Sequence, residues 1–466
     1  MEPPTIDTGN TAWLLVSSAL VLLMTPGLAL FYGGLNRAKG VLNMMMMSFA
    51  SIGLISVLWL CYGFTVAFGD DVNGVWGDLG QYLGTRTFVN GIWGETGIPL
   101  YVFLAFQMMF AVITVALISG AISDRARFAG WLLFAVGWAT LVYFPVAHWV
   151  WGGGFIGAGI GALDFAGGTA VHINAGAAAL GVALVLGRRI GWPKDRFKPH
   201  NVPMVALGAA LLWFGWFGFN AGSELTADAT TAIAFLNTQV ATAAAVLGWL
   251  IVERIRYGRP TMVGASSGAV AGLVAITPAC AFVTPWAAVL LGLVAGAACA
   301  LAVSLKYRLG YDDSLDVVGV HFVAGWIGSL WIGLFGSRAV SSLVTDEGLL
   351  LGGGLAQLGR QAAASAIVSV YSFALAFAIA YVVEKTIGFR ATAESEIHGI
   401  DVAEHAESAY DLSPASGSGA FAVAGTGGAA VEGRPAATGA PDSAATAVAR
   451  GPAGAPRKAA APVTDE

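Results

Sequence analysis

Two histidines lie in long apolar stretches of the sequence, and their surroundings are similar. His172 stands in ALDFAGGTAVHINAG and His321 in SLDVVGVHFVAGWIG, and each follows a Leu-Asp pair that ends in Asp164 or Asp316. An ionisable side chain at membrane depth is costly and usually marks a substrate or proton path. A histidine that only hydrogen-bonds a helix backbone is the structural alternative for either one alone. Two in equivalent places favour a pore lined by neutral imidazoles, which can relay a hydrogen bond or a proton.

The two aspartates are predicted to support these histidines. A carboxylate can accept hydrogen bonds at the N-terminus of a helix, or it can favour a cation nearby. We expect Asp164 near the outer end of its helix and Asp316, its counterpart, near the inner end of another. Both are interpreted as structural supports with an electrostatic role.

Aromatic residues form the third group with possible chemistry. Phe106 and Phe110 are four residues apart and therefore share one helix face. Aromatic residues in a membrane helix usually serve packing or the interface belt. Rings together with a serine hydroxyl can instead bind a small cation through the ring quadrupole and one hydrogen bond. The group also includes the aromatic residues Trp151, Trp216 and Phe219, and Ser223 supplies the hydroxyl.

The composition predicts an all-α membrane protein. Of 466 residues, 57% are hydrophobic and 11% charged, whereas soluble domains carry roughly 25% charged residues. A bilayer crossing takes about 20 apolar residues. The uncharged run between Pro260 and Lys306 is too long for one crossing and is read as two spans joined by a tight turn. Eleven spans are expected, at 11–33, 43–68, 99–122, 129–150, 169–187, 202–221, 230–252, 262–280, 286–305, 315–336 and 361–383.

The basic residues predict how these spans are oriented. Of 23 Lys and Arg, 16 follow odd-numbered spans, so the N-terminus is expected outside and the C-terminus in the cytoplasm. Ten spans divide into two sets of five, and an odd number per set gives two inverted repeats with the eleventh helix added. His172 then falls in the fifth span and His321 in the tenth. The first residues lack the basic segment of a cleavable signal peptide, so the first span is expected to be retained.

Three parts are expected along the chain. Residues 1–396 form the membrane domain, 397–412 a short cytoplasmic regulatory segment, and 413–466 an Ala/Gly/Pro-rich tail predicted to be disordered. The three cysteines have no spacing suited to a metal or disulfide framework. We expect no metal, no cofactor and no nucleic-acid partner, and the absence of a nucleophile–base pair argues against an enzyme.

Several motifs resemble those of the ammonium transporter (Amt/Mep/Rh) family, in its bacterial Amt type. They are ALFYGGLNRAK at 29–39, WGGG at 151–154, LDFAGGTAVHINAG at 163–176, WFGFNAGS at 216–223 and LDVVGVH at 315–321. The resemblance covers roughly residues 10–411. It implies a homotrimer in the cell inner membrane, with one hydrophobic pore in each subunit.

The resemblance also implies a role for each matching residue. Phe110, Trp151 and Ser223 match an outer ammonium-recruitment site that Asp164 supports. The pore gate corresponds to Phe106, Phe110, Phe219 and Trp216, and the pore lining to His172 and His321. The segment HGIDVAEHAESAYDL is similar to the one through which bacterial members take part in binding a nitrogen-regulatory PII protein. It departs from the family pattern His-Gly-Glu at His405-Ala406-Glu407.

Together these features predict a transporter that recruits ammonium, deprotonates it near Phe110 and Phe219, and conducts ammonia past the histidines. Potassium has nearly the same size but cannot shed its charge, so it would face the full cost of dehydration. Two alternatives stay open. One is an ammonium sensor that signals through its tail and conducts little, and the other is a Rh-like channel for neutral ammonia or another small solute.

Overall fold

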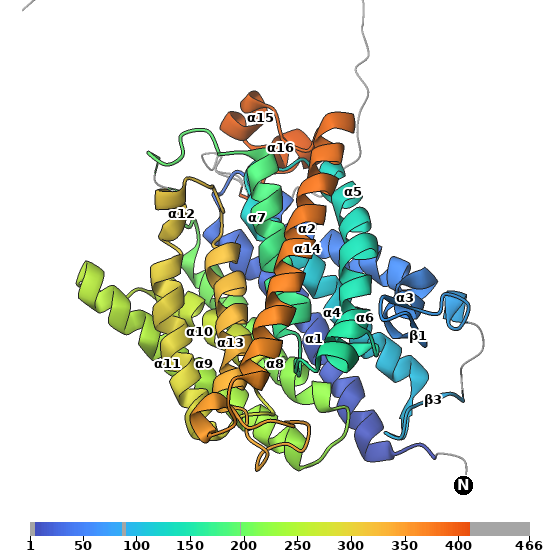
Figure 1. Ribbon diagram of the computed structural model, residues 1–466. Coiled ribbons are helices and arrows are strands. Elements are labelled where there is room, and N and C mark those ends of the chain that lie inside the picture. Colours follow the sequence, from blue (N-terminus) through green and yellow to red (C-terminus); the bar gives the residue numbers. More distant parts are fainter. Residues whose placement is uncertain (1–4, 86–89, 196, 411–466) are drawn as a thin grey trace, which may run out of the picture. The chain divides into compact units, whose positions relative to one another are not determined.

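The computed structural model describes residues 5–85, 90–195 and 197–410. Long helices stand side by side across this part of the chain, as Figure 1 shows. The helices are α1 (Thr8–Leu35), α2 (Val41–Leu58), α3 (Phe64–Phe68), α4 (Leu100–Ile118), α5 (Phe128–Trp138), α6 (Phe144–Trp151), α7 (Asn174–Leu186), α8 (Val202–Ala221), α9 (Ala229–Tyr257), α10 (Met262–Ile276), α11 (Pro285–Ala302), α12 (Leu305–Leu309), α13 (Val323–Phe335), α14 (Ala356–Thr386), α15 (Ala393–His398) and α16 (Ile400–His405).

Two small antiparallel hairpins lie between α3 and α4. Strand β1 (Asp71–Val72) pairs with β2 (Trp76–Gly77), and β3 (Ile92–Trp93) pairs with β4 (Ile98–Pro99). His148 of α6 holds the first hairpin, because its Nε2 lies 2.9 Å from the Asp71 carboxylate. The first hairpin is therefore anchored against α6.

The chain is predominantly helical, and most expected spans coincide with helices. Among the described residues, ten helical segments are long and apolar enough to cross a membrane, and each overlaps one predicted span. The eighth predicted span, 262–280, contains the shorter α10 of 15 residues. This helix ends at Ile276 because the chain turns through Pro278, whose carbonyl accepts a hydrogen bond from the Phe165 N–H.

Small residues allow the helices to approach closely. A Cβ at Gly208 of α8 would lie 2.3 Å from the backbone nitrogen of Phe31 in α1. A Cβ at Gly292 of α11 would lie 2.0 Å from the carbonyl oxygen of Ala241 in α9. Backbone-to-backbone packing of this kind replaces the hydrophobic driving force, which is absent between helices in lipid. The glycine-rich composition is therefore a requirement of the helix crossings.

Both histidines lie on widened helical turns. The segments Gly168–Ile173 and Val318–Phe322 are π-helical and lead directly into α7 and α13. Such turns are frequent at functional sites, and the described residues contain three more, at Trp59–Gly63, Ala139–Tyr143 and Phe155–Ile160. The similar local geometry of two segments far apart in the sequence matches the similarity of their motifs.

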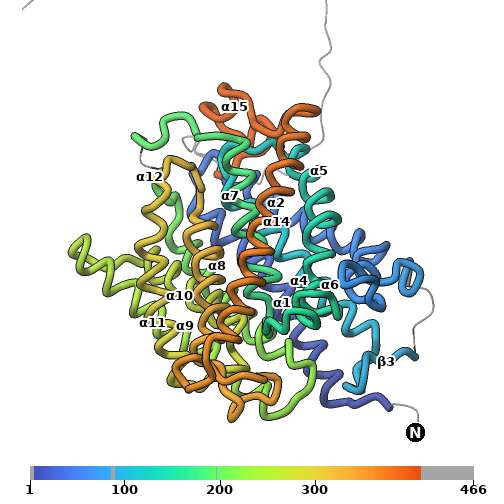
Figure 2. The backbone as a smooth tube through the Cα atoms, viewed as in Figure 1, coloured from blue at the N-terminus to red at the C-terminus, as the bar shows by residue number. Residues whose placement is uncertain are grey.

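The last described segment packs across the ends of other helices. Figure 2 shows the chain after α14 folding back into α15 and α16 at one end of the bundle. The Asp401 carboxylate accepts the backbone N–H groups of Leu42 and Asn43 in α2, and Glu404 accepts that of Phe128 at the start of α5. Residues 411 and 412 of the expected regulatory segment, and the whole tail 413–466, lie outside the described residues.

A buried ion pair lies at the same end. Arg189 donates from Nε and Nη2 to the two oxygens of Asp312, at 2.9 and 2.8 Å, and Arg125 donates to the Asp312 carbonyl. Burial by itself would raise the pKa of the Asp312 carboxyl, but the hydrogen bonds and charge of Arg189 outweigh it and hold that pKa below its usual value. Burial lowers the pKa of Arg125 to about 10, so this side chain stays cationic at neutral pH.

Replacing Asp312 by Asn is expected to destabilise the protein strongly, because it removes the carboxylate next to Arg125 and leaves Arg189 only its longer contact with Asp124, at 3.7 Å. Breaking a buried pair in this way costs about 3–5 kcal/mol. The contribution of Asp312 is present above the pKa of an unfolded aspartate and is lost only as pH falls through the depressed folded pKa. Thermal unfolding of the purified protein at pH 7 measures the effect.

The matched control is Asp346→Asn. Asp346 pairs with Arg360 at 2.5 Å, but about a third of each side chain is exposed, and such pairs contribute about 0–1 kcal/mol. Equal losses of thermal stability in the two variants would contradict the assignment.

Candidate functional site

A cavity of about 160 Å³ brings together residues from several separate parts of the chain. It holds Phe110, Trp151 and Ser223, the three residues predicted to form an outer cation site. The Phe110 and Trp151 rings meet edge to face, with centroids 6.1 Å apart and planes at 87°. The remaining lining residues are Phe68, Trp93, Phe103, Gln107, Phe165 and Leu225. Aromatic side chains in a cavity wall can hold a small cation against their ring faces.

The polar atoms of Ser223 and Trp151 are fixed by backbone carbonyls. The Ser223 hydroxyl donates at 2.7 Å to the carbonyl of Phe219, in the last turn of α8. Its lone pairs therefore remain available as acceptors in the cavity. The Trp151 indole N–H donates to the Asp164 carbonyl at 2.9 Å. Both side chains are thereby held in place through their donor hydrogens. The Ser223 lone pairs and the face of the Trp151 ring, which a cation would contact, are not used.

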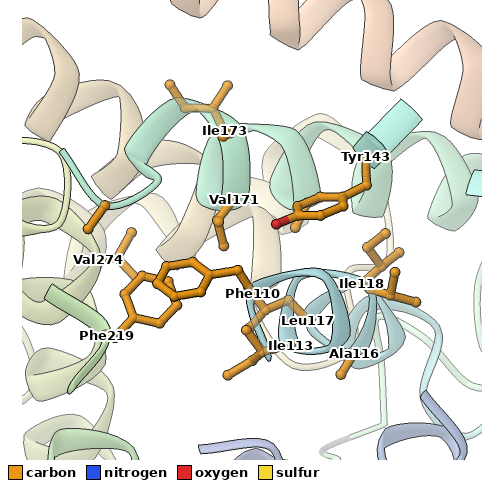
Figure 3. Close-up of a cluster of buried hydrophobic side chains, with 14 of the residues drawn as sticks. Phe110, Ile113, Ala116, Leu117, Ile118, Tyr143, Val171, Ile173, Phe219 and Val274 are labelled. Carbon is orange, nitrogen blue, oxygen red and sulfur yellow. The ribbon is translucent and has the colours of Figure 1, made fainter. Parts of the chain in front are cut away.

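Two stacked phenylalanines close the cavity at its base. The rings of Phe110 and Phe219 lie 4.2 Å apart at an angle of 29°, and Figure 3 shows them overlapping between α4 and α8. Both are essentially inaccessible to solvent. Phe106 packs behind Phe110 with ring centroids 4.9 Å apart and is not among the residues that line the cavities. Phe110 lines the outer cavity and Phe219 lines the space that contains the histidines, so the stacked pair lies between the two.

Beyond the stacked rings lies this narrow apolar space of about 10 Å³, which both histidines line. The Nδ1 atoms of His172 and His321 are 3.4 Å apart, so one nitrogen must carry the proton and the other accept it. Trp216 lies against His172 at 5.5 Å between ring centroids, and its indole N–H is engaged by the Thr277 hydroxyl. The other lining residues are apolar side chains.

A third cavity of about 40 Å³ continues from the histidines. It shares His321, Phe31 and Val270 with the histidine space, and it adds the polar groups of Tyr32 and Asp316. The three cavities thus form a row: an aromatic cavity, a narrow space with two imidazoles, and a cavity with a carboxylate. The predicted recruitment residues Phe110, Trp151 and Ser223 line the first cavity, and the predicted lining residues His172 and His321 line the second. Trp216, predicted for the gate, lines the second cavity beside His172, and Phe106 and Asp164 line neither of the two.

Asp164 lies behind the site rather than in its wall. Its two carboxylate oxygens accept the backbone N–H groups of Gly167, Gly168, Thr169 and Ala170 at 2.7–3.0 Å. These N–H groups begin the π-helical turn that carries His172, and they have no intrahelical acceptor. Asp164 therefore caps the His172 segment and, through its carbonyl, also positions Trp151.

Asp316 is not the counterpart of Asp164, contrary to the prediction from the Leu-Asp motif. The Asp313 carboxylate accepts the N–H groups of Val317 and Val318, at 3.1 and 2.7 Å, and so caps the His321 segment. Asp316 instead pairs with Lys306 at 2.7 Å. Asp313 precedes its histidine by eight residues, as Asp164 does. That spacing, rather than the Leu-Asp pair, is the sequence signal for the cap.

Comparison with known proteins agrees with this arrangement. The model of the Ammonium Transporter Family matches residues 12–410. The chain belongs to the ammonium transporter family. This confirms the resemblance of the sequence motifs.

Curated relatives and solved structures cover nearly the same part of the chain. An ammonium transporter of Mycobacterium tuberculosis (strain ATCC 25618 / H37Rv) is 55% identical over 439 residues, covering 88% of this chain and 92% of the relative. That of Bacillus subtilis (strain 168) is 48% identical over 419 residues, covering 87% and 99%. The crystal structure of Saccharomyces cerevisiae Mep2 aligns with a TM-score of 0.76 at 35% identity, covering 84% and 89%. A structure described as a sensor Amt protein aligns at 0.79 and 30%, covering 85% and 98%.

Within this family member, six lining residues of the outer cavity were not predicted. Phe103 and Gln107 lie on the same face of α4 as Phe110, since Gln107 is four residues after Phe103 and three before Phe110, and this periodicity could have indicated them. Phe68 ends a short helix, and Trp93, Phe165 and Leu225 lie between helices. Their approach depends on how the connecting segments fold, and those segments carry no periodic signal.

Replacing Asp164 by Asn is expected to lower thermal stability. A single amide oxygen replaces two carboxylate oxygens, so part of the set of four N–H groups is left without an acceptor at a cost of about 1–3 kcal/mol. Asp228→Asn is the control, because Asp228 caps the exposed start of α9 and Asn caps helices about as well as Asp. Thermal unfolding in detergent measures both, and an unchanged midpoint for Asp164→Asn would contradict the capping role.

Proposed function

We propose that the protein conducts ammonia derived from ammonium, which it recruits in the aromatic cavity and which gives up its proton to water in that cavity, near the Phe110–Phe219 pair. The observation that carries this proposal is the order of the cavities. A site suited to a cation is followed directly by a space suited to a neutral molecule. A carrier of intact cations would need polar groups along the whole path.

Selection between ammonium and potassium follows from the same order. Both ions are attracted by ring faces, so the aromatic wall alone separates them weakly. Ammonium donates hydrogen bonds to Ser223, and it can leave its charge behind as a proton. Potassium would enter the narrow space as a bare charge with no oxygen ligands, which is a large desolvation cost.

The hydrogen-bonded histidine pair suits the passage of ammonia. Facing nitrogens that share one proton can donate to or accept from a neutral guest by exchanging tautomers. The Trp216 and Phe219 rings next to His172 hold the imidazole plane in position. We infer that His172 and His321 line the conducting path and that Phe110, Phe219 and Trp216 form its gate, with Phe106 as packing behind it.

The same proposal includes the membrane arrangement. We infer eleven spans in a cell inner membrane, with α10 as the short eighth, the N-terminus outside and α15 and α16 in the cytoplasm. The paired caps at Asp164 and Asp313 and the paired π-helical turns support two inverted repeats. We further propose that the protein is a homotrimer and that a PII protein is its cytoplasmic partner, with α15 and α16 in the surface that it contacts.

An ammonium sensor is the second candidate function, and the similarity to the sensor Amt structure favours it. Both functions need the outer cavity, but only a transporter needs sustained flux through the histidine space. A Rh-like channel for neutral ammonia would not need the cation site of Trp151 and Ser223. Ammonium flux into sealed proteoliposomes distinguishes these three possibilities.

The double variant His172→Ala/His321→Ala is expected to lose at least about 90% of the flux, because the narrow space would then offer no hydrogen-bonding group to ammonia; a tenfold loss corresponds to about 1.4 kcal/mol of barrier. Uptake of labelled methylammonium by proteoliposomes measures it. His200→Ala, at the end of the bundle where His200 contacts Tyr410, is expected to retain flux. Undiminished uptake in the double variant would exclude the histidine path.

The variant Ser223→Ala is expected to raise the half-saturating ammonium concentration about five- to tenfold, the loss of one hydrogen bond of about 1 kcal/mol, with little change in maximal flux. Ser18→Ala is a matched control, since the Ser18 hydroxyl also donates to the carbonyl four residues earlier at 2.7 Å but lies outside the cavity lining. A fall in maximal flux with unchanged half-saturation would count against the recruitment role.

A further inference from the structure

His148 is a buried histidine that the proposed function does not use. It lies in α6 three residues before Trp151, and its side chain is inaccessible to solvent. Its Nδ1 lies 3.1 Å from the carbonyl oxygen of Ala67 in α3, and its Nε2 lies 2.9 Å from Oδ1 of Asp71 in β1. The imidazole therefore joins α6 to two other elements, which lie beside it in Figure 1.

Both nitrogens of this imidazole face oxygens that accept hydrogen bonds. A backbone carbonyl has no proton to donate, and an ionised carboxylate has none either. A neutral imidazole carries one N–H, so its other nitrogen would direct a lone pair at an acceptor oxygen. Two hydrogen bonds therefore require the His148–Asp71 pair to hold one proton more than a neutral histidine and a carboxylate hold together.

This additional proton belongs on the histidine. The hydrogen bond from His148 holds the pKa of the Asp71 carboxyl below its usual value, outweighing the effect of burial, and the Gly74 N–H that donates to Oδ2 acts in the same direction. Asp71 is therefore ionised at neutral pH. The contact is one between an imidazolium and a carboxylate, and such charge-assisted hydrogen bonds are stronger than neutral ones.

Asp71 is the charged group that contacts His148 in the part of the chain that the structure describes. The other carboxylates near the hairpin have partners of their own, since Asp70 accepts from Gln81 and Asp78 accepts from the Gly80 N–H. Neither α3 nor the rest of α6 contains a titratable side chain. The titratable residues on the other segments that contact α6, each engaged elsewhere, are Tyr62, Tyr143, Asp164, His172 and Tyr371.

The two hydrogen bonds of His148 connect two walls of the outer cavity. Ala67, which accepts one of them, immediately precedes Phe68, and Trp151 follows His148 by one helical turn. Phe68 and Trp151 both line that cavity. The second hydrogen bond holds Asp71 and with it the hairpin that follows Phe68. The distance between these two walls therefore depends on contacts that need the proton.

We propose that His148 is a positioning residue for the outer cavity, and that the proton it holds against Asp71 makes the affinity of this cavity for ammonium depend on pH. The proposal rests on the recruitment step of the proposed function and adds regulation to it. With the proton present, both hydrogen bonds hold α3 and the hairpin against α6. When a rise in pH removes the proton, one of them becomes a contact between two acceptors. The stabilisation is therefore complete at mildly acidic pH and is lost as the pH rises.

The variant Asp71→Asn tests the role of the proton, because asparagine has the shape of aspartate and suits a neutral histidine. Its amide oxygen can accept the Gly74 N–H as Oδ2 does. Its NH2 group can donate to Nε2, so the single imidazole proton stays on Nδ1 for the Ala67 carbonyl. The variant Asp71→Ala removes the contact at every pH. Asp78→Asn is the control, since the Asp78 side chain accepts the exposed N–H of Gly80 and does not contact His148.

Thermal unfolding and the Kd for methylammonium, a cation that stays protonated in this range, are measured on the detergent-purified full-length protein between about pH 6 and pH 9. We expect the Kd of the wild type and of Asp78→Asn to rise about five- to tenfold over this range, the loss of one hydrogen bond. The Kd of Asp71→Asn should change less than about twofold. Relative to this variant, the wild type should lose thermal stability as the pH rises. Asp71→Ala should bind as weakly at the acidic end of the range as the wild type does at the alkaline end.

Two results would overturn the inference. Parallel pH profiles of the wild type and Asp71→Asn would mean that other groups cause the pH dependence. Equal affinity of Asp71→Ala and the wild type at the acidic end would mean that the contact does not position the cavity. The outcome is separable from that of the proposed function. If the wild type binds methylammonium but conducts none in proteoliposomes, conduction fails while the Kd profiles still decide the role of His148. If it binds none at any pH, the recruitment step and this inference are both excluded.

Discussion

The cost of placing a charge in a narrow apolar space is the constraint on which the rest of this structure depends. The space around the two imidazoles measures about 10 Å³, and its other walls are apolar. At low dielectric a charge there has nothing to replace its water. In the proposed function, ammonium leaves that charge behind on the outer side. The aromatic cavity is suited to a cation, and the stacked Phe110 and Phe219 rings lie between it and the histidine space.

Holding two imidazoles face to face in this space requires rigid support. Each histidine lies on a π-helical turn, and each turn begins at a buried carboxylate that accepts several backbone N–H groups. These contacts satisfy the exposed amides of a helix start at membrane depth, where no water would do so. The caps therefore stabilise the fold and fix the separation of the Nδ1 atoms by the same hydrogen bonds.

The helical architecture and the central residues of the site could be predicted from the sequence, since apolar runs and the two histidine motifs are strong local signals. The cap of the second histidine could not be assigned from the Leu-Asp motif. Asp316 occupies the position of Asp164 in the Leu-Asp motif, but Asp313 lies eight residues before His321, as Asp164 lies before His172. This spacing brings the Asp313 carboxylate to the N–H groups at the start of the turn. Phe68 and Trp93 were missed because their role arises from tertiary contact between α4 and the segments that precede it. Phe106 shares the periodicity of Phe110, yet its ring packs one layer behind.

Helix α7 is held at both ends, and this bears on how the segment of α15 and α16 relates to the histidine space. At its start, the Asp164 cap fixes the turn that carries His172. At its end, Arg390 donates to the Leu186 carbonyl and also to Glu396 of α15. A short helix that is fixed at both ends leaves the His172 imidazole little room to move. The 3.4 Å contact between the two Nδ1 atoms requires this rigidity. Glu396 of α15 holds the Arg390 side chain that contacts the end of α7, so α15 contributes to the support of the helix that follows the His172 turn.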